Sequence, residues 1–329
     1  MGGGSSAPPP GLRNLGNTCY ANALVQALLA VPIFTTAVLK NVSAGRICNV
    51  SDSIRTLFID MILMSSNDKT NSISPRAFIS AIQSDIKCIT NATAPQDAHE
   101  AMVCILEAIE RSAPPYSLMN DVIKGGRMRT VTRCLECKAC WASPASWQDA
   151  ERFTCIILPL PQKNHVSSSL LLRSYLGSDT VGGWKCEKCG CTVNIERRIQ
   201  LQTLPRVLVL CVPYLGTSGN SKTHRAYPSR QFIIMQPSDE NADRSTSVTT
   251  RYNLFSMVEH RDSNSTGHYV AYARHRDTWY ECDDDVVREV SWDDITRSGD
   301  RNIYMMIYEA ETIPTPSQAY KPPASGGST

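Results

Sequence analysis

The chain has 329 residues, of which 42% are hydrophobic and 19% are charged, and its net charge is +2. This balance is typical of a globular protein that is long enough to form a sizeable core. A net charge near zero, without long runs of one sign, does not indicate nucleic acid or an acidic membrane surface as a partner. No run of the sequence approaches the roughly 18 apolar residues of a membrane span.

The two ends of the chain, residues 1–10 and 311–329, are rich in Gly, Ser and Pro, and we expect both to be flexible. The first ten residues contain neither a basic nor an apolar segment, so no signal peptide is expected. The thirteen cysteines are therefore expected to act as thiols in metal binding and catalysis rather than in disulfides. We expect an intracellular monomer, located in the cytoplasm, the nucleus or both.

The first third of the chain has the spacing of helices. Tyr20, Leu24 and Leu28 recur every fourth residue after Cys19, and Pro32 ends this helix. Helical spacing is also found in the segments 53–66, 75–85 and 97–112. Pro75 is expected just inside the start of its helix, because a proline is tolerated in the first turn.

From about Met128 the pattern changes to short β-branched or alternating runs, which predict strands. These runs are 152–161, 195–204, 206–215, 230–237, 251–260, 268–275, 278–290 and 302–310. Helices followed by strands indicate an α+β fold rather than a wound parallel sheet.

Cys19 follows a loop of asparagines and glycines in the stretch "GLRNLGNTCYANALVQALL", residues 11–29. Asn17 or Thr18 can cap the helix that follows, which places Cys19 in its first turn. The positive end of the helix dipole favours a thiolate, the nucleophilic form of cysteine. Asn14 is close enough in sequence to donate its amide to an oxyanion at the same site. The alternative interpretation is a small buried thiol.

A nucleophilic cysteine requires a histidine, which in turn requires an orienting carboxylate or amide. The stretch "GHYVAYARHRDTWYECDDD" predicts two strands around a turn at 274–277. A turn centred between His275 and Arg276 would place His268 directly opposite Asp283, with Cβ atoms about 5 Å apart. The alternatives are a surface or core histidine and a solvated acidic turn. His99, between two acidic residues of a predicted helix, is assigned a structural or contact role, and four further histidines are assigned to loops or strands: His165, His224, His260 and His275.

Two cysteine-rich segments, "CLECKAC" and "CEKCGC", lie at the two ends of a long stretch of the chain. Two Cys-x-x-Cys pairs form a tetrahedral thiolate site for Zn²⁺, and a glycine after the second pair suits the turn. Cys137 and Cys140 also form a Cys-x-x-Cys pair, so the identity of the two cysteines in the first ligand pair stays open. We favour a structural zinc site made by Cys134, Cys137, Cys186 and Cys189. The alternatives are unliganded thiols and, less in keeping with the pattern, a redox dithiol.

These motifs resemble those of the ubiquitin-specific proteases. Residues 11–29 resemble the Cys box of that family, and "GHYVAYARHRDTWYECDDDVV" resembles its His box. "PQDAHEAMVCIL" and "LQTLPRVLVL" resemble two segments that the family carries between the boxes, and the cysteine pairs lie where its zinc-binding fingers do. The similarity extends from Gly11 to about Glu309.

The resemblance implies a papain-like fold with a thumb at about 11–127, fingers at about 128–200 and a palm at about 201–310. It implies a deubiquitinating thiol hydrolase that acts on ubiquitin or ubiquitinated proteins. In such an enzyme Cys19 would attack the C-terminal glycine carbonyl of ubiquitin, and His268 would accept the thiol proton.

The resemblance also implies roles for five other residues. Asp283 would orient His268, with Asp284 as a helper, and Asn14 would line the oxyanion hole. Asp97 and Glu100 match positions that contact the basic ubiquitin tail, an interaction that acidic side chains favour.

Three features depart from the family pattern. The segment "CVPYLG", residues 211–216, replaces a usual Leu-Lys-Arg-Phe run, and Cys282 replaces a frequent aromatic residue. Cys140 and Cys191 have no clear counterpart. Three alternatives stay open: a protease for another ubiquitin-like modifier, a slow or inactive ubiquitin-binding scaffold, and a zinc-dependent interaction module.

Overall fold

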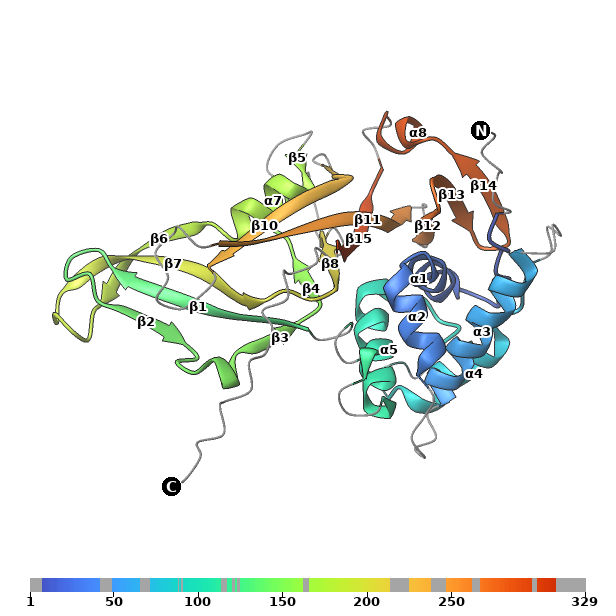
Figure 1. The fold of residues 1–329 in the computed structure, drawn as a ribbon, viewed down its shortest axis with the longest axis horizontal. Coiled ribbons are helices and arrows are strands. Elements are labelled where there is room, and N and C mark those ends of the chain that lie inside the picture. The colour runs from blue at the N-terminus through green and yellow to red at the C-terminus, as the bar shows by residue number, and fades with distance from the viewer. Residues whose placement is uncertain are drawn as a thin grey trace, which may run out of the picture.

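The computed structural model describes residues 8–41, 49–65, 72–87, 89, 91–113, 117–119, 122, 125–161, 166–213, 225–237, 247–261, 267–297 and 301–311. Most of the two expected flexible ends, and the predictions for His165 and His224, lie outside these residues. The helices α1 to α5 gather at one end of the molecule, and strands β1, β2, β6 and β7 extend away at the other (Figure 1). We call the helical part the thumb.

The thumb confirms the helical pattern of the first third of the chain. Its helices are α1 (Cys19–Leu29), α2 (Pro32–Lys40), α3 (Asn49–Ser65), α4 (Arg76–Asp85) and α5 (Ala98–Ser112). Pro75 is the residue before the first turn of α4 rather than a residue within it, so its predicted position was wrong by one residue. Pro32 begins α2, where its missing N–H costs no hydrogen bond.

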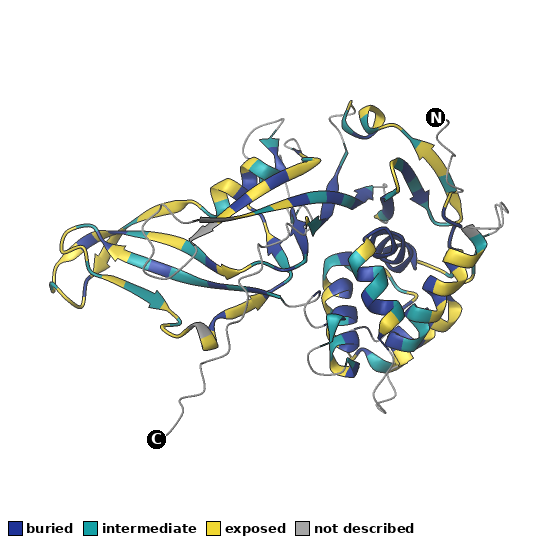
Figure 2. Cartoon of the chain, viewed as in Figure 1, coloured by how far each residue is buried: buried dark blue, intermediate teal, exposed yellow. Residues whose placement is uncertain are grey.

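Helix α1 is the centre of the molecule. Each of its residues is buried, which Figure 2 shows as a continuous dark blue helix. It packs against α2 and α5 on the thumb side and, on the other side, against β11 (Ser247–Arg261), β12 (His268–His275) and β13 (Thr278–Asp283). A helix that is buried on all sides needs mostly small or apolar residues, and "CYANALVQALL" provides them at all positions except Asn22 and Gln26. These two side chains donate hydrogen bonds to Asp284 and to the Pro10 carbonyl.

A mixed sheet, which we call the palm sheet, lies beside α1. Its order is β14-β13-β12-β11-β15-β8-β4, and β10 also pairs with β11. Its strands are β4 (Cys155–Ile157), β8 (Val207–Cys211), β10 (Gln231–Pro237), β11 (Ser247–Arg261), β12 (His268–His275), β13 (Thr278–Asp283), β14 (Val286–Val290) and β15 (Ile303–Ala310). All pairs are antiparallel except β4 with β8.

A second sheet, which we call the fingers sheet, has the order β2-β1-β7-β6, with β3 also paired to β1. Its strands are β1 (Gly126–Cys134), β2 (Cys140–Ser143), β3 (Glu151–Phe153), β6 (Ser178–Lys185) and β7 (Thr192–Thr203). The remaining elements are β5 (Val166–Ser167) paired with β9 (Ala226–Tyr227), the 3₁₀ turn η1 (Trp147–Asp149), and helices α7 (Ser168–Tyr175) and α8 (Trp292–Arg297). The range expected for the fingers, 128–200, also includes β4, which belongs to the palm sheet.

The structure differs from the sequence-based expectation at several elements. The run 278–290 is two strands, β13 and β14, because the chain turns at Asp284, whose φ is +52°. Helices α7 and α8 and strand β6 were not predicted. Most residues of β6 are exposed, so the strand carries no apolar alternation.

Both faces of the palm sheet carry apolar cores. The thumb helices pack on one face, with alternate β12 residues such as Ala271 and Ala273 beneath α1. The opposite face packs with α7 and α8, and carries Tyr272. The tip of the fingers sheet has only four buried apolar residues of its own, namely Cys134, Cys186, Val193 and Ile195.

No single helix of the described part is long and apolar enough to cross a membrane, and only α1 and α2, bent by 98°, reach that length together.

Candidate functional site

Cys19 is the first residue of α1 and is 8% exposed. The loop before it turns sharply at Gly16 and Asn17, whose φ angles are +101° and +49°. Thr18 occupies the cap position, but its side chain makes no capping bond to the helix, so the capping bond expected from Asn17 or Thr18 is absent. The Thr18 hydroxyl accepts from the Leu15 amide at 2.9 Å instead. The first-turn amides near Cys19 thus have no side-chain cap.

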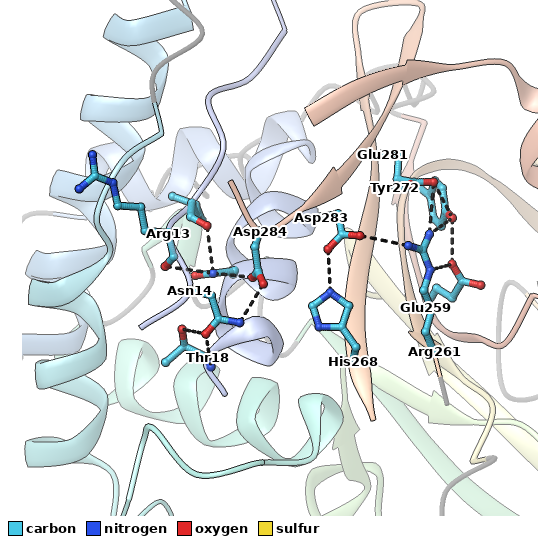
Figure 3. A network of polar contacts seen from close by, with 12 residues as sticks. Arg13, Asn14, Thr18, Glu259, Arg261, His268, Tyr272, Glu281, Asp283 and Asp284 are labelled. Atoms are coloured by element: carbon cyan, nitrogen blue, oxygen red, sulfur yellow. Dashed lines mark hydrogen bonds and ion pairs between the residues drawn. The ribbon is translucent and has the colours of Figure 1, made fainter. Parts of the chain in front are cut away.

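Asn14 lies in this loop and ties it together. Its Oδ1 accepts from the amides of Gly16 at 2.9 Å and Thr18 at 3.2 Å. Its Nδ2 donates to Asp284 Oδ2 at 2.8 Å (Figure 3). The amide that the sequence assigns to an oxyanion hole therefore also joins the Cys19 loop to the His box.

The predicted pairing of His268 with Asp283 is correct as a contact and wrong in register. His275 pairs with Thr278, so the hairpin is centred one residue later than expected. A shift of the centre by one residue moves each cross-strand partner by two, which keeps both side chains on one face and makes them diagonal neighbours. His268 Nε2 lies 2.7 Å from Asp283 Oδ1 (Figure 3).

His268 also contacts Cys19. Its hydrogen bond to the Cys19 thiol, together with the bond to Asp283, raises the pKa of His268 to about 9, although partial burial opposes this shift. Because Nε2 faces Asp283, Nδ1 is the ring nitrogen that remains for the sulfur. The structure thus brings Cys19, His268 and Asp283 into one hydrogen-bonded line.

Arg261 is a member of this site that sequence reasoning missed. Its Nη1 donates to the second oxygen of Asp283 at 3.2 Å, and its Nε bonds Glu259 at 2.9 Å. Tyr272 and Glu281 complete the same network (Figure 3). No local motif marks this arginine, because β11 meets β12 and β13 only after the sheet forms.

Asp284 lies beside this line, with a carboxylate oxygen within 4.8 Å of both a His268 ring nitrogen and an Asp283 carboxylate oxygen. Its carboxylate accepts from Asn14 and from Asn22, each at 2.8 Å, and its carbonyl accepts from the Leu12 amide at 2.8 Å. A Cβ on Gly11 would lie 2.3 Å from the Asp285 carbonyl oxygen, so only glycine permits this close approach. The turn between β13 and β14 therefore positions the loop that carries Cys19.

Gly267, which precedes His268, has a packing role. A Cβ at Gly267 would lie 1.9 Å from His260 Nε2. His260 in turn packs on Tyr269 with ring centroids 4.7 Å apart. His260 and His275 lie on strands, as expected, and burial lowers the pKa of His275 to about 4.

Asp97 and Glu100 lie at the start of α5. Asp97 caps this helix by accepting from the Glu100 amide at 2.9 Å, and its other oxygen accepts from Tyr304 at 2.7 Å. The Asp97 carboxylate therefore has structural partners, whereas Glu100 is exposed.

His99, between these two acids, contacts Cys155 and Cys211. A hydrogen bond to Cys155 raises the pKa of His99. Bonds from Cys211 and then His99 lower the pKa of Cys155 to about 6, while the bond with Cys155 and burial raise the pKa of Cys211. His99 has the contact role expected of it, but with two thiols that the sequence did not link to it.

The four cysteines favoured as zinc ligands lie together at the tip of the fingers sheet. The sulfurs of Cys134, Cys137, Cys186 and Cys189 all lie within 4.8 Å of one another, and the Cys137 and Cys186 sulfurs are 3.8 Å apart. The Gly190 amide donates to the Cys186 carbonyl at 2.8 Å, with φ of +71° at the glycine.

Two zinc–sulfur bonds of about 2.3 Å in a tetrahedron separate their sulfurs by roughly 3.8 Å, so these residues fit Zn²⁺. Cys140 and Cys191 are not members of the group. Elsewhere in the described part, Cys104 is disulfide-bonded, an exception to the expected use of the cysteines as thiols.

A cysteine at a helix start, hydrogen-bonded to a histidine that is oriented by a carboxylate, has the arrangement of a cysteine hydrolase of the papain type. The family model for ubiquitin carboxyl-terminal hydrolase matches residues 10–308. The chain belongs to this family, which confirms the resemblance of the Cys and His boxes.

Curated relatives carry the same family name. Ubiquitin carboxyl-terminal hydrolase 16 of Arabidopsis thaliana is 24% identical over 94% of this chain and 31% of its own length. Ubiquitin carboxyl-terminal hydrolase 36 of Drosophila erecta is 24% identical over 95% of this chain and 30% of its own length. The chain therefore spans about a third of the length of the curated relatives it matches.

Solved structures show the same fold. The SAGA DUB module Ubp8/Sgf11/Sus1/Sgf73 bound to monoubiquitin matches with a TM-score of 0.73 and 18% identity, over 95% of this chain and 72% of that chain. The same module bound to ubiquitin aldehyde matches with a TM-score of 0.74 and the same identity and coverage. The thumb, palm and fingers architecture expected of the α+β chain is thus confirmed.

Proposed function

We propose that the chain is a cysteine deubiquitinase that hydrolyses the isopeptide or peptide bond after the C-terminal Gly-Gly of ubiquitin. The observation that carries this proposal is the hydrogen-bonded line of Cys19, His268 and Asp283 in a member of this family. The structurally similar DUB modules are bound to ubiquitin or ubiquitin aldehyde, which supports ubiquitin as the partner.

The first half of the reaction uses the contact between Cys19 and His268. With its pKa raised to about 9, His268 is protonated at neutral pH and favours the thiolate of Cys19. The thiolate attacks the glycine carbonyl carbon, and the carbonyl oxygen becomes an oxyanion. His268 then gives its proton to the leaving amine, and a thioester on Cys19 remains.

The second half hydrolyses the thioester. Neutral His268 accepts a proton from water, the water oxygen attacks the thioester carbon, and the Cys19 thiolate leaves. Asp283 orients the imidazole through Nε2 and stabilises its cationic form. Asn14 donates one amide hydrogen to Asp284 and has a second for the oxyanion, where such donors contribute about 3–4 kcal/mol.

The start of α5 supplies the contact for the basic ubiquitin tail. Glu100 is exposed and can form charge-assisted hydrogen bonds with an arginine of the tail. Asp97 contributes its charge while it caps the helix and accepts from Tyr304. This arrangement makes Glu100 the direct contact and Asp97 the residue that positions it.

We further propose that the four-cysteine group holds a structural Zn²⁺ ion. The ion would join the hairpin of β1 and β2 to that of β6 and β7, where apolar packing is small. We also propose that the thumb spans about 11–127, the fingers about 128–200 and the palm about 201–310. The proposed enzyme is an intracellular monomer.

Mass spectrometry with ubiquitin carrying a C-terminal thiol-reactive electrophile tests this function. We expect one adduct on Cys19 in the wild-type chain and none in Cys19→Ala. A probe made from another ubiquitin-like modifier is tested in parallel. Labelling by that probe alone would show that the substrate is that modifier and not ubiquitin. A folded chain that forms no adduct with either probe would instead be a binding scaffold.

A further inference from the structure

Three reactive side chains other than Cys19, His268 and Asp283 meet where the thumb packs on the palm sheet. His99 lies on α5, Cys155 is the first residue of β4, and Cys211 is the last residue of β8. Each offers one ligand atom, and the three atoms lie within 4.8 Å of one another. Cys211 is buried, while His99 and Cys155 are partly exposed, so an ion can reach the group from one side.

The sheet register argues against a disulfide between the two cysteines. Cys155 pairs with Val209, and Ile157 pairs with Cys211, so the two thiols are two residues apart along parallel strands. The strand spacing and rise place their Cα atoms about 8 Å apart. A disulfide requires a Cα separation below about 6.8 Å, so the strands would have to move to form one. Both cysteines are free.

A metal ion needs no such movement, because it bridges sulfurs that are separated by roughly 3.8 Å. One imidazole and two thiolates form a ligand set that suits thiophilic d¹⁰ ions. The Tyr304 hydroxyl donates to Asp97, the residue that caps α5 before His99, at 2.7 Å. This bond ties the start of α5 to β15, the strand that pairs with β8 at Cys211.

We propose that His99, Cys155 and Cys211 form a second metal site, for a thiophilic ion such as Zn²⁺, which joins helix α5 of the thumb to the palm sheet. Three protein ligands leave the fourth tetrahedral position for water or another small ligand. The site contributes one ligand from the thumb and two from the palm, so the bound ion stabilises the packing of these two parts.

Zinc content of the full 329-residue chain tests the proposal. The protein is equilibrated with excess Zn²⁺, freed of unbound ion by gel filtration and measured by plasma mass spectrometry. We expect about two ions per wild-type chain and about one in His99→Ala and in Cys211→Val. Cys282→Ala, which removes a different buried thiol, is the matched control and retains about two.

A second readout uses Co²⁺ in place of Zn²⁺. Two thiolate ligands give a sulfur-to-cobalt charge-transfer band, and this band should weaken in Cys211→Val but not in Cys282→Ala. Added Zn²⁺ should also raise the melting temperature of the wild-type chain more than that of His99→Ala, because only the former binds the ion between thumb and palm.

Equal metal content in the wild-type chain and His99→Ala would overturn the proposal. Because His99 is partly exposed, its variant keeps the test valid if Cys211→Val does not fold. Cys189→Ser, which removes a fingers ligand, should lower the content by one ion independently. A wild-type chain with one ion that is lost in Cys189→Ser and kept in His99→Ala would leave only the fingers site.

Discussion

In the proposed function the carboxylate of Asp283 orients the imidazole of His268 and stabilises its charge, so its removal should affect turnover more than binding. We expect Asp283→Asn to lower kcat by about 10²–10⁴-fold, the range of a general acid–base contribution, with little change in KM. Hydrolysis of a fluorogenic ubiquitin substrate and a ubiquitin binding isotherm separate the two effects. Asp293→Asn, which changes an exposed acid of α8, is the control. Full turnover in Asp283→Asn would transfer the orienting role to Asp284.

The raised pKa of His268 has a consequence for the pH profile. Protonated His268 supplies the proton for the leaving amine in the proposed reaction, so we expect kcat/KM to fall above about pH 9. Asp283→Asn removes one cause of the raised pKa, and the alkaline limb should therefore move to lower pH. An alkaline limb that stays in place in this variant would contradict the assignment to His268.

The same shift links protonation of His268 to stability. Its folded pKa of about 9 lies above the ordinary value of 6.5, so protonated His268 stabilises the folded state. This contribution is fully present below pH 6.5 and is lost as the pH rises through about 9. Urea unfolding across this range, compared with His268→Gln, should show a decline with pH that is absent from the variant.

At the scale of elements, the turn between β13 and β14 joins the His box to the Cys box. Asp284→Ala removes the acceptor of two amides, those of Asn14 and Asn22, and should lower the free energy of unfolding by about 1–3 kcal/mol. Asp284→Asn keeps one acceptor oxygen and tolerates the positive φ, so it should lower the free energy of unfolding by less than Asp284→Ala does.

A double-mutant cycle tests whether this contact carries the effect. Combining Asp284→Ala with Asn22→Ala should cost less than the sum of the two single changes, since both remove the same hydrogen bond. Denaturant unfolding gives the four free energies. Strict additivity would show that Asp284 acts on stability by another route, such as its backbone conformation.

The elements also show how far sequence reasoning extends. Helix α1 was predictable because Tyr20, Leu24 and Leu28 repeat every fourth residue, and the hairpin contact of His268 with Asp283 was predictable because strand periodicity tolerates an even shift. The register itself was not, since nothing local in 274–277 places the turn at Arg276 rather than one residue earlier. Arg261 and the Cys155–Cys211 contact depend on strand order, which no local pattern encodes.

At the scale of the whole molecule, the thumb and palm share one large core, and the fingers sheet does not. Helices α1 to α5 and one face of the palm sheet form a continuous apolar cluster, and a second cluster lies on the opposite face. The tip of the fingers has four buried apolar residues, two of which are the cysteines Cys134 and Cys186. The tip therefore depends on its four thiols, whereas Cys19 lies in the large core that thumb and palm share.

This division predicts a selective effect when the fingers site is lost. Cys186→Ser should lower the melting temperature, and the fingers sheet should no longer unfold in a cooperative transition. The reason is that structural zinc contributes folding free energy directly. Cys19 lies in the core of the thumb and palm, so its alkylation by a small electrophile should keep its rate. We also propose that the fingers contact the bound ubiquitin, so cleavage of a ubiquitin substrate should fall through a raised KM.

Thermal scans of wild-type protein and Cys186→Ser, with and without a zinc chelator, separate these effects. Cys191→Ser, which changes an exposed thiol outside the four-sulfur group, is the control and should behave as wild type. Chelation that removes all zinc and leaves both the melting temperature and ubiquitin hydrolysis unchanged would show that the tip is stable without metal. Equal loss of small-electrophile alkylation and ubiquitin hydrolysis would show that the two cores unfold as one unit.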